Sequence, residues 1–219
     1  RHIAPRVVHI GCSADEFAAM RERIVPRATG VVLEIGFGSG LNLPHYDPRK
    51  VDLLIGIEPD EAMLEIAEDA LSHTPFAAEL HQAFAERLPL QDAVADTVVI
   101  TYSLCTFAGP ARALKEIRRI LKPDGRLLFC EHGAAHDWRA KLQRGLNGAW
   151  GKLFGGCNIT RDPIVTLEAA GFATGDDAVK PFPLPQMLLG THSSGEAGAR
   201  AWAARRPVQH APQDRTEAG

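Results

Sequence analysis

The chain has 219 residues, of which 45% are hydrophobic and 23% are charged, and its formal net charge is −3 at pH 7. This length and composition predict one ordinary globular domain, and the slightly acidic balance gives no reason to expect a nucleic-acid partner. No apolar run approaches the roughly 18 residues that a membrane span requires, so no integral membrane segment is expected. The four cysteines are widely spaced and form no Cys-x-x-Cys pair. This spacing predicts reduced thiols in a cytoplasmic protein, without a disulfide framework.

Helices and strands are predicted to alternate along the chain. Hydrophobic spacing, caps and turn residues predict, in order, a helix at about 14–27, strands at 31–36 and 51–57, a helix capped by Asp60, strands near 78–84 and at 96–101, a helix from Pro110, a strand at 126–130, a helix from Asp162 to Gly171, and short strands near 173–181 and 186–192. This alternation predicts an α/β fold: a Rossmann-like three-layer sandwich with a mostly parallel seven-stranded sheet and helices on both faces.

Three glycines at alternate positions follow the first predicted strand. Residues 31–35 are apolar except for Glu34, and Gly36, Gly38 and Gly40 come directly after them. Glycines at these positions allow a sharp turn and let the backbone approach a ligand closely. Since ligands of such sheets bind beyond the carboxyl ends of the strands, the loop predicts a nucleotide-like ligand at that edge.

Two carboxylates narrow the choice of ligand. Glu58 ends the second predicted strand, 18 residues beyond Gly40, where it can accept hydrogen bonds from both hydroxyls of a ribose. Enzymes that bind NAD share this arrangement, but here the third glycine comes one residue early and Pro44 limits the helix that would hold a pyrophosphate. Glu34 suits a cationic ligand better than a pyrophosphate, because a buried carboxylate requires a partner.

The complete set of motifs resembles the class I S-adenosylmethionine-dependent methyltransferases, especially the type 11 branch, from about Val31 to Glu131. Four segments carry the resemblance in the right order: Val32-Leu-Glu-Ile-Gly-Phe-Gly-Ser-Gly40, Gly56-Ile-Glu-Pro-Asp60 with Met63-Leu64, Ala85-Glu-Arg-Leu-Pro89 before Asp96-Thr-Val-Val99, and Leu121-Lys-Pro-Asp-Gly-Arg-Leu127. The resemblance implies S-adenosyl-L-methionine as the cofactor.

The same resemblance implies the cofactor-binding residues, which are Glu34, Gly36, Gly38, Gly40, Glu58, Pro59, Met63, Ala85, Glu86, Tyr102 and Ser103. Glu34 and the glycine backbone would face the methionine part, Glu58 the ribose, and Ala85 with Glu86 the adenine. Tyr102 and Ser103 would lie under the sulfonium. Core packing is the more ordinary role for Met63, and Glu86 is also compatible with an exposed loop.

The C-terminal half resembles the branch that contains the animal membrane-associated thiol S-methyltransferases. The matching segments are Phe129-Cys-Glu-His-Gly133 and Phe154-Gly-Gly-Cys-Asn-Ile-Thr-Arg161. The resemblance implies a small thiol as methyl acceptor, such as sulfide, methanethiol or another alkyl or aryl thiol. A thiol with a pKa near 8.5 needs only a modest shift to form the nucleophilic thiolate. We expect His132, Tyr102 and Cys157 to be the catalytic residues, with His132 assisting deprotonation before in-line methyl transfer.

Alternatives remain at this point. His132 is equally consistent with a loop anchor, and Cys157 with a small buried hydrophobe. Glu131, His132, His136 and Cys157 follow no standard zinc spacing, so no metal site is expected. The alternative functions are N- or O-methylation of a small amine, a phospholipid head group or a quinone-like ring, and cofactor binding without catalysis. A phospholipid acceptor would favour a basic entrance, and no Lys/Arg cluster is evident near residues 132–161.

We expect a single domain over residues 1–192, with a cofactor-binding core at 31–131 and a substrate cover at about 132–161. Within the cover, Trp138, Leu142, Leu146 and Trp150 recur at helical spacing with glycines between them, which predicts a movable helix whose apolar face lines a substrate pocket or packs on the sheet. Residues 193–219 are rich in Gly, Ala and Arg, which predicts a flexible tail.

Overall fold

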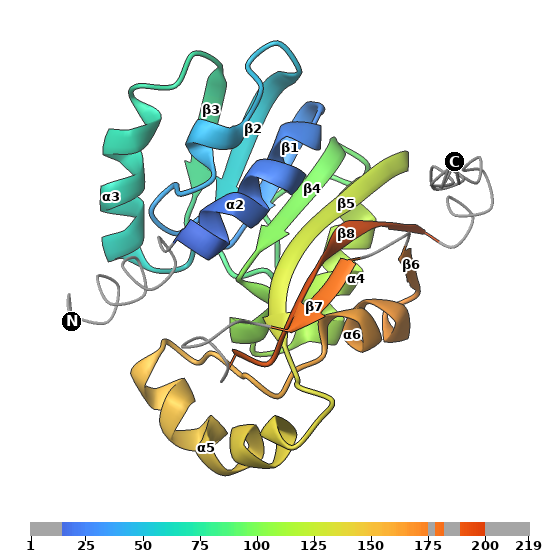
Figure 1. Cartoon of the computed structure of the whole chain (residues 1–219). Coiled ribbons are helices and arrows are strands. Elements are labelled where there is room, and N and C mark those ends of the chain that lie inside the picture. Colours follow the sequence, from blue (N-terminus) through green and yellow to red (C-terminus); the bar gives the residue numbers. More distant parts are fainter. Residues whose placement is uncertain (1–14, 175–177, 182–188, 200–219) are drawn as a thin grey trace, which may run out of the picture.

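A computed structural model describes residues 15–174, 178–181 and 189–199. Its centre is a sheet with helices on both faces (Figure 1). The strands are β1 (Gly30–Ile35), β2 (Val51–Ile57), β3 (Ala77–His81), β4 (Ala95–Thr101), β5 (Leu121–Gly133), β6 (Phe172–Thr174), β7 (Ala178–Pro181) and β8 (Thr191–Ala199). Their order is β3-β2-β1-β4-β5-β8-β6, with β7 paired to β8 off this path. Strands β1 to β5 pair in parallel, and β8 runs antiparallel to β5. The expected mostly parallel sandwich is confirmed.

The helices differ in how they begin, and two of them follow an aspartate cap. They are α2 (Asp15–Ile24), α3 (Glu61–Leu71), α4 (Pro110–Ile120), α5 (Arg139–Leu153) and α6 (Pro163–Ala169), with short 3-10 turns η1 (Val25–Arg27), η2 (Leu43–His45) and η3 (Leu104–Thr106). The carboxylate of Asp60 accepts the first amides of α3, and that of Asp162 accepts an amide in α6. Pro44 lies in η2, so the turn after the glycine loop stays short, as expected.

Side chains from successive strand positions enter two different cores, one on each face of the sheet. The first core packs α4 and α6 on the sheet and includes Leu33, Ile57, Ile100, Leu114, Ile117, Phe129 and Leu167. The second packs α2 and α3 on the opposite face and includes Phe17, Val32, Leu54, Ala67, Val99 and Leu128. Because both faces are covered, the parallel strands are nearly continuous apolar runs. The polar ligand-binding positions are therefore left to the strand ends.

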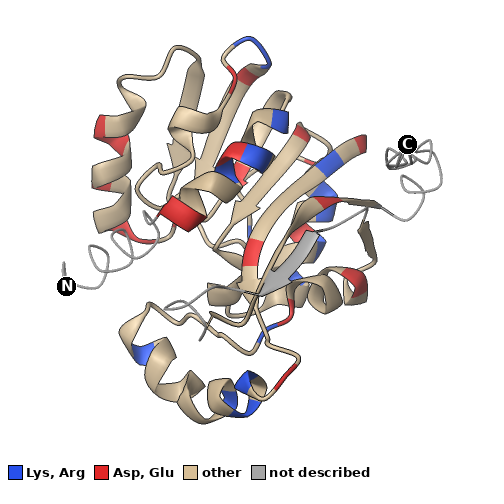
Figure 2. Ribbon diagram, in the orientation of Figure 1, with Lys and Arg blue, Asp and Glu red and all other residues tan. Residues whose placement is uncertain are grey.

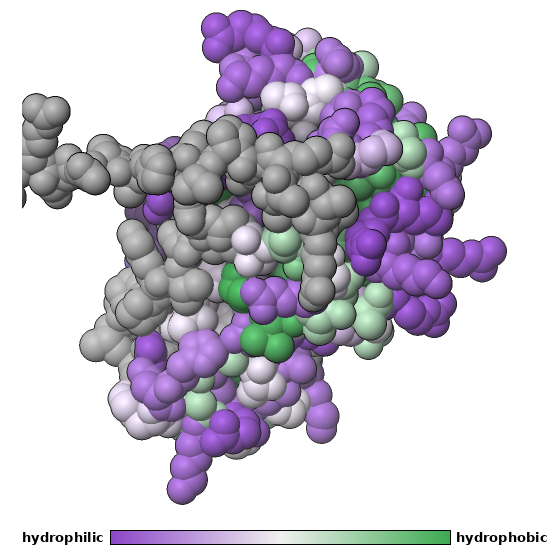
Figure 3. All heavy atoms as spheres, turned by 90° about the vertical axis from the view of Figure 1, so that its right-hand side faces the viewer, coloured by the Kyte–Doolittle hydropathy of each residue, from purple (hydrophilic) through white to green (hydrophobic). Residues whose placement is uncertain are grey.

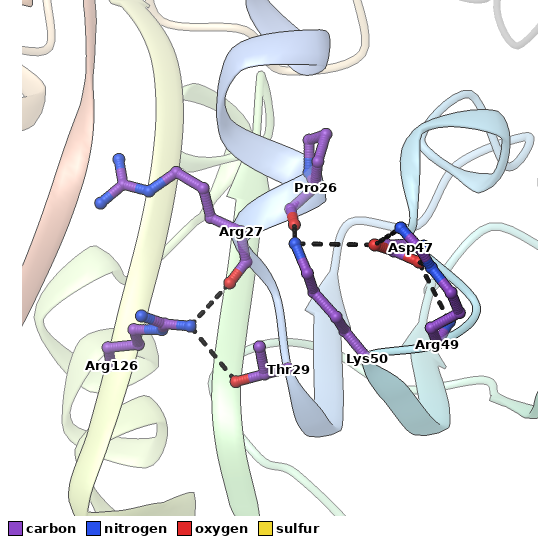
Figure 4. A network of polar contacts seen from close by, with 7 residues as sticks. All are labelled: Pro26, Arg27, Thr29, Asp47, Arg49, Lys50 and Arg126. Carbon is purple, nitrogen blue, oxygen red and sulfur yellow. Dashed lines mark hydrogen bonds and ion pairs between the residues drawn. The ribbon is translucent and has the colours of Figure 1, made fainter.

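The amino ends of the strands are fastened by polar contacts to the segment between α2 and β1 (Figure 4). The guanidinium of Arg126 donates to the carbonyl of Arg27 at 2.6 Å and to the hydroxyl of Thr29 at 3.2 Å. The ammonium of Lys50 donates to the carbonyl of Pro26 at 3.1 Å. These contacts join α2 to β2 and β5 at the edge opposite the carboxyl ends, so that α2 can extend across the sheet toward the ligand side.

The expected boundary of the domain at residue 192 is wrong. Residues 193–199 belong to β8, which pairs with β5 along one edge and with β6 and β7 along the other. Glu196 is 5% exposed and forms ion pairs with Arg27 and Arg126. The strand is made of small and polar residues and is buried because it pairs with other strands along both edges. Its sequence therefore lacks the apolar alternation by which a strand is usually predicted. Residues 200–219 lie outside the described residues.

The helix of the expected cover is α5, and the apolar side chains at its start are exposed, whereas Trp150 near its end packs beside Cys157. Trp138 just before it, Leu142 and Leu146 are 67%, 41% and 39% exposed. Gln143 in α5 accepts from the amide of Ala135 at 2.8 Å, and Asn147 accepts from that of Ile159 at 3.0 Å. The exposure of Trp138, Leu142 and Leu146 does not fit the expected apolar contacts of this helix, whereas the packing of Trp150 does.

Charge is distributed unevenly over the helices. Figure 2 shows basic residues on α5 and acidic residues along α3. The sequence of α5 contains four basic residues and no acidic one (Arg139, Lys141, Arg144 and Lys152). The face shown in Figure 3 is largely hydrophilic, with apolar side chains between charged ones. Among the described residues, no helix combines the length and apolar character needed to cross a membrane.

Candidate active site

A cavity of about 390 Å³ lies at the carboxyl ends of β1, β2 and β4, a size typical of small-molecule and cofactor sites. It is lined by nearly all the residues predicted to bind the cofactor: Glu34, Gly36, Gly38, Glu58, Pro59, Met63, Ala85, Glu86, Tyr102 and Ser103. Gly40 is the exception. A Cβ there would come within 2.9 Å of Leu43, and its φ of +83° is a left-handed turn conformation, so Gly40 shapes the loop without lining the cavity.

The glycine loop combines close packing with open space. A Cβ on Gly36 would lie 2.4 Å from the Cβ of Ser103, whereas the nearest atom to a Cβ on Gly38 would be 4.0 Å away. Both glycines have positive φ, at 75° and 57°. Gly36 therefore lets the loops after β1 and β4 meet, and Gly38 leaves room for a ligand beside the backbone.

Glu34 is 2% exposed at the end of β1 and lines the cavity. Its carboxylate accepts hydrogen bonds from the side-chain amide of Asn42 at 2.9 Å and from the hydroxyl of Tyr46 at 2.7 Å. Burial raises its pKa to about 7, although these two hydrogen bonds and the nearby Arg21 act in the opposite direction. Asn42 and Tyr46 were not predicted, because their link to Glu34 depends on how the turn around η2 folds back.

Glu58 connects the glycine loop to the start of α3. One carboxylate oxygen accepts from the amide of Gly38 at 2.8 Å, and the other accepts from the amide of Asp60 at 3.0 Å. The side chain is 8% exposed, and burial raises its pKa above the ordinary value. A carboxylate has about four acceptor positions, so each oxygen can still accept from a ligand hydroxyl.

The far end of the cavity is formed by the segment after β3. Ala85 and Glu86 both line it, and Glu86 accepts from the amide of Gly109 at 2.8 Å. Glu86 therefore connects this segment to the start of α4 and is not simply a solvated loop residue. Phe84, which was not predicted, lines the same end with 67% of its surface exposed. An exposed aromatic ring there can pack against a planar ligand group.

Tyr102 lines the cavity, but its hydroxyl belongs to a buried network. The oxygen lies 2.6 Å from Nε2 of His192 and 3.2 Å from Sγ of Cys130. Burial raises the pKa of Tyr102 well above its ordinary value. The hydroxyl therefore stays protonated at neutral pH and cannot act as a general base there. Its φ of 54° is unusual for a residue with a side chain and marks a constrained turn at the end of β4. These observations favour a structural role for Tyr102 in lining the cavity over the catalytic role expected from the sequence.

His132 and Cys157 do come together. Nε2 of His132 lies 3.2 Å from Sγ of Cys157, and Cys105 joins them: one ligand atom from each of the three residues lies within 4.8 Å of the other two. The pKa of Cys157 is lowered to about 4, chiefly by the thiol of Cys105 and by His132. His136 is elsewhere, in contact with the carboxylate of Asp162 at 3.2 Å. The sequence places Cys105 among the candidates for the acceptor pocket, because it follows the fourth strand, but it gives no reason to expect Cys105 beside His132 and Cys157.

The cluster lies against one wall of the cavity. Ser103 and Thr106, on either side of Cys105, line the cavity, as do Phe154 and Gly155, which precede Cys157. The amide of Cys157 donates to the carbonyl of Phe154 at 3.0 Å, and that of Asn158 donates to the carbonyl of Cys105 at 3.1 Å. These bonds hold the loop after α5 against η3, so Cys105 and Cys157 both lie in segments that also supply residues to the cavity wall.

Comparison with known proteins places the chain in a family. A methyltransferase domain family matches residues 33–129. Thiol S-methyltransferase TMT1A of Homo sapiens is 35% identical over 162 residues, which cover 72% of this chain and 66% of that protein. TMT1B of Rattus norvegicus is 31% identical over 170 residues, covering 76% and 69%. The crystal structure of YcgJ from Bacillus subtilis superposes with a TM-score of 0.61 at 23% identity, over 78% of this chain and 74% of that one.

These matches agree with the chemistry of the cavity. Its carboxylates can accept ribose hydroxyls and attract a cationic group, and Gly38 leaves space beside the backbone. The cofactor expected from the sequence, S-adenosylmethionine, is thereby confirmed. The chain belongs to the class I S-adenosylmethionine-dependent methyltransferases.

Proposed function

We propose that this enzyme methylates the sulfur atom of a small thiol. The observation that carries the proposal is the buried cluster of Cys105, His132 and Cys157 against the cavity wall. Two relatives named thiol S-methyltransferases, at 35% and 31% identity, support it. Sulfur and imidazole groups in an apolar setting suit a soft, polarisable acceptor better than a charged amine.

The cofactor part of the proposal assigns one task to each carboxylate. Glu58 accepts hydrogen bonds from the ribose hydroxyls, and Glu34 faces the cationic methionine end. Ala85, Glu86 and Phe84 border the adenine. When bound, S-adenosylmethionine supplies a methyl group on a sulfonium, which is already activated, so the protein has to align the acceptor and exclude water.

The acceptor part assigns His132 and Cys157 to contact with the incoming sulfur. Trp150 and Phe154 stack with ring centroids 4.2 Å apart next to Cys157, which gives this side of the site an apolar lining. A small alkyl or aryl group fits such a lining, whereas an amine that is protonated at neutral pH would lose its hydration there without a carboxylate partner. Tyr102 contributes its ring and backbone to the wall between acceptor and cofactor.

The nearest rival keeps the cofactor and changes the acceptor. A ubiquinone/menaquinone biosynthesis C-methyltransferase UbiE of Geotalea uraniireducens is 30% identical over 107 residues, which cover 47% of this chain and 45% of that protein. That match is shorter than those to TMT1A and TMT1B, which extend over 162 and 170 residues. A quinone-like ring is therefore the second candidate.

The test is a panel of acceptors incubated with methyl-labelled S-adenosylmethionine. The panel contains sulfide, an alkyl thiol, an aryl thiol, a primary amine, a phospholipid vesicle and a reduced quinone. Label on thiols alone is the expected result. Label on the amine, lipid or quinol alone would show that the acceptor is wrong, and no label on any of them, with intact cofactor binding, would favour a noncatalytic protein.

A further inference from the structure

We propose that Cys105, His132 and Cys157 form a zinc site with its fourth position open toward the cofactor cavity. The three residues come from η3, the end of β5 and the loop after α5. They are 4%, 6% and 8% exposed. Three protein ligands and one open position are typical of catalytic zinc, whereas structural zinc sites use four protein ligands.

The distances fit this ion. With Zn–S bonds of about 2.3 Å and Zn–N bonds of about 2.0 Å, ligand atoms around tetrahedral zinc lie about 3.6–3.8 Å apart. The ligand atoms of Cys105, His132 and Cys157 all lie within 4.8 Å of one another, and the His132–Cys157 pair is at 3.2 Å. Small side-chain movements, well within rotamer flexibility, are sufficient to reach the coordination geometry.

The surroundings of the cluster also favour a metal. Nδ1 of His132 has no hydrogen-bond partner among the described residues, and Nε2 of this buried ring lies 3.2 Å from the sulfur of Cys157. A buried imidazole with so few polar contacts is costly unless it binds something further. Two thiolates and a neutral imidazole carry two negative charges, which Zn²⁺ balances, so that the loaded site is neutral within the apolar cluster that includes Ile159.

The ligands are held in place by the groups around them. The carboxylate of Glu131 accepts from the amides of Ser103 and Leu104 at 2.9 and 3.0 Å, and thus fixes the turn that carries Cys105. The guanidinium of Arg161 donates to the carbonyl of Leu104, which joins the loop of Cys157 to the same turn. Such supporting contacts keep metal ligands oriented before the ion binds.

The open position gives the site a function, and this step rests on the proposed thiol acceptor. Thr106, next to Cys105, and Gly155, two residues before Cys157, line the cavity, so the proposal places the open position on the cavity side of the cluster. Zinc binds thiolates strongly and lowers the pKa of a bound thiol. The acceptor would bind as a thiolate, and its proton would leave to solvent water before methyl transfer.

Metal binding alone tests the site without any acceptor. Purified protein is stripped with a chelator and titrated with Zn²⁺ against a competing chromophoric chelator, and Co²⁺ is used to record thiolate-to-cobalt absorption. The expected result is one ion per chain for the natural protein. Cys105→Ala and Cys157→Ala should each lose at least tenfold in affinity and weaken the cobalt absorption, whereas Cys130→Ala should change neither.

Cys130 is the matched control because it is equally buried but lies outside the cluster. Thermal unfolding and S-adenosylmethionine binding of each variant show that it is folded. The absence of stoichiometric binding in the natural protein, or equal binding by all three variants, would overturn the site.

The open position has its own readout. Adding an alkyl thiol to the cobalt-loaded protein should increase the thiolate-to-cobalt absorption, and an alkylamine of the same length should not. If cobalt binds but its thiolate-to-cobalt absorption does not change when the thiol is added, the open position is contradicted and the metal is structural. Thiol methylation by a chain that binds no zinc would refute the metal site and leave the proposed function standing.

Discussion

Nε2 of His132 lies 3.2 Å from Sγ of Cys157, across a separation of 25 residues. The contact joins the end of β5 to the loop after α5 and brings both side chains beside a cavity whose other walls fit S-adenosylmethionine. The position of this pair distinguishes the acceptor side of the site from the cofactor side.

Replacing Glu58 should remove the acceptor for the ribose hydroxyls. Because hydrogen bonds to a charged group contribute about 1.5–3 kcal/mol each, we expect Glu58→Ala to weaken S-adenosylmethionine binding at least tenfold, as measured by calorimetry. Glu61→Ala is the control, because Glu61 is exposed in the first turn of α3 and does not line the cavity. Equal affinities for the two variants would refute the ribose assignment.

Cofactor binding should weaken as the pH falls through the pKa of Glu34. Burial raises that pKa to about 7, so the side chain loses the charge that attracts a cation below this pH. Between pH 8 and pH 6 the ionised fraction falls about tenfold, and we expect the affinity to fall by the same factor.

The groups that face Glu34 do not mask this effect. Burial raises the pKa of Tyr46 well above its ordinary value, so this neighbour of Glu34 does not titrate over this range. Glu58 also interacts with Glu34, so its variant serves as a reference. Glu34→Gln should bind more weakly at pH 8 and lose most of the pH dependence in calorimetry. An unchanged pH profile in Glu34→Gln would exclude Glu34 as its source.

The two tyrosines should respond differently to the loss of a hydroxyl. Tyr102→Phe removes the hydroxyl that lies 2.6 Å from Nε2 of the buried His192, so we expect a loss of about 1–3 kcal/mol in the free energy of unfolding and a nearly unchanged kcat. Tyr46→Phe removes the bond to Glu34 and should weaken cofactor binding at pH 7. Chemical denaturation and initial rates measure both effects. A large loss of kcat in Tyr102→Phe at unchanged stability would restore a catalytic role for Tyr102.

Strand β8 should contribute to the stability of the domain through Glu196. This carboxylate is 5% exposed and pairs with Arg27 and Arg126, so Glu196→Gln should lower the free energy of unfolding by about 1–3 kcal/mol. Glu79→Gln is the control, because its partner His81 is at the surface and the Glu79 side chain is 49% exposed. If the two variants unfold at the same denaturant concentration, Glu196 has no such role.

The cofactor side could be predicted because its signals are local in the sequence. Gly36, Gly38 and Glu58 lie at the ends of apolar strands, and parallel strands bring their carboxyl ends to one edge. Phe84, Asn42 and Tyr46 could not be found in the same way. Their positions depend on the turns that carry them, and a turn is specified by its packing more than by a residue pattern.

The arrangement of the acceptor side could not be predicted from the sequence. Cys105, His132 and Cys157 follow no short ligand motif, and only the sheet topology and the loop after α5 bring them together. Strand β8 was missed for a related reason: Ser193, Ser194 and Glu196 are buried by neighbouring strands, which single-sequence patterns do not reveal. Helix α5 shows a further limit of the sequence pattern. Its apolar residues recur at regular spacing, but polar side chains, those of Gln143 and Asn147, make hydrogen bonds to the rest of the protein.

The most direct test of the central claim is a comparison of kcat/KM for three acceptors that differ in one atom. Propanethiol, propanol and propylamine share size and shape, and mass spectrometry of the methylated products with S-adenosylmethionine gives each rate. The proposed function predicts a kcat/KM for the thiol at least a hundredfold above those of the alcohol and the amine, and a loss of most of that activity in Cys157→Ala with cofactor affinity retained. Equal rates for the three acceptors, or a preference for the amine, would contradict it.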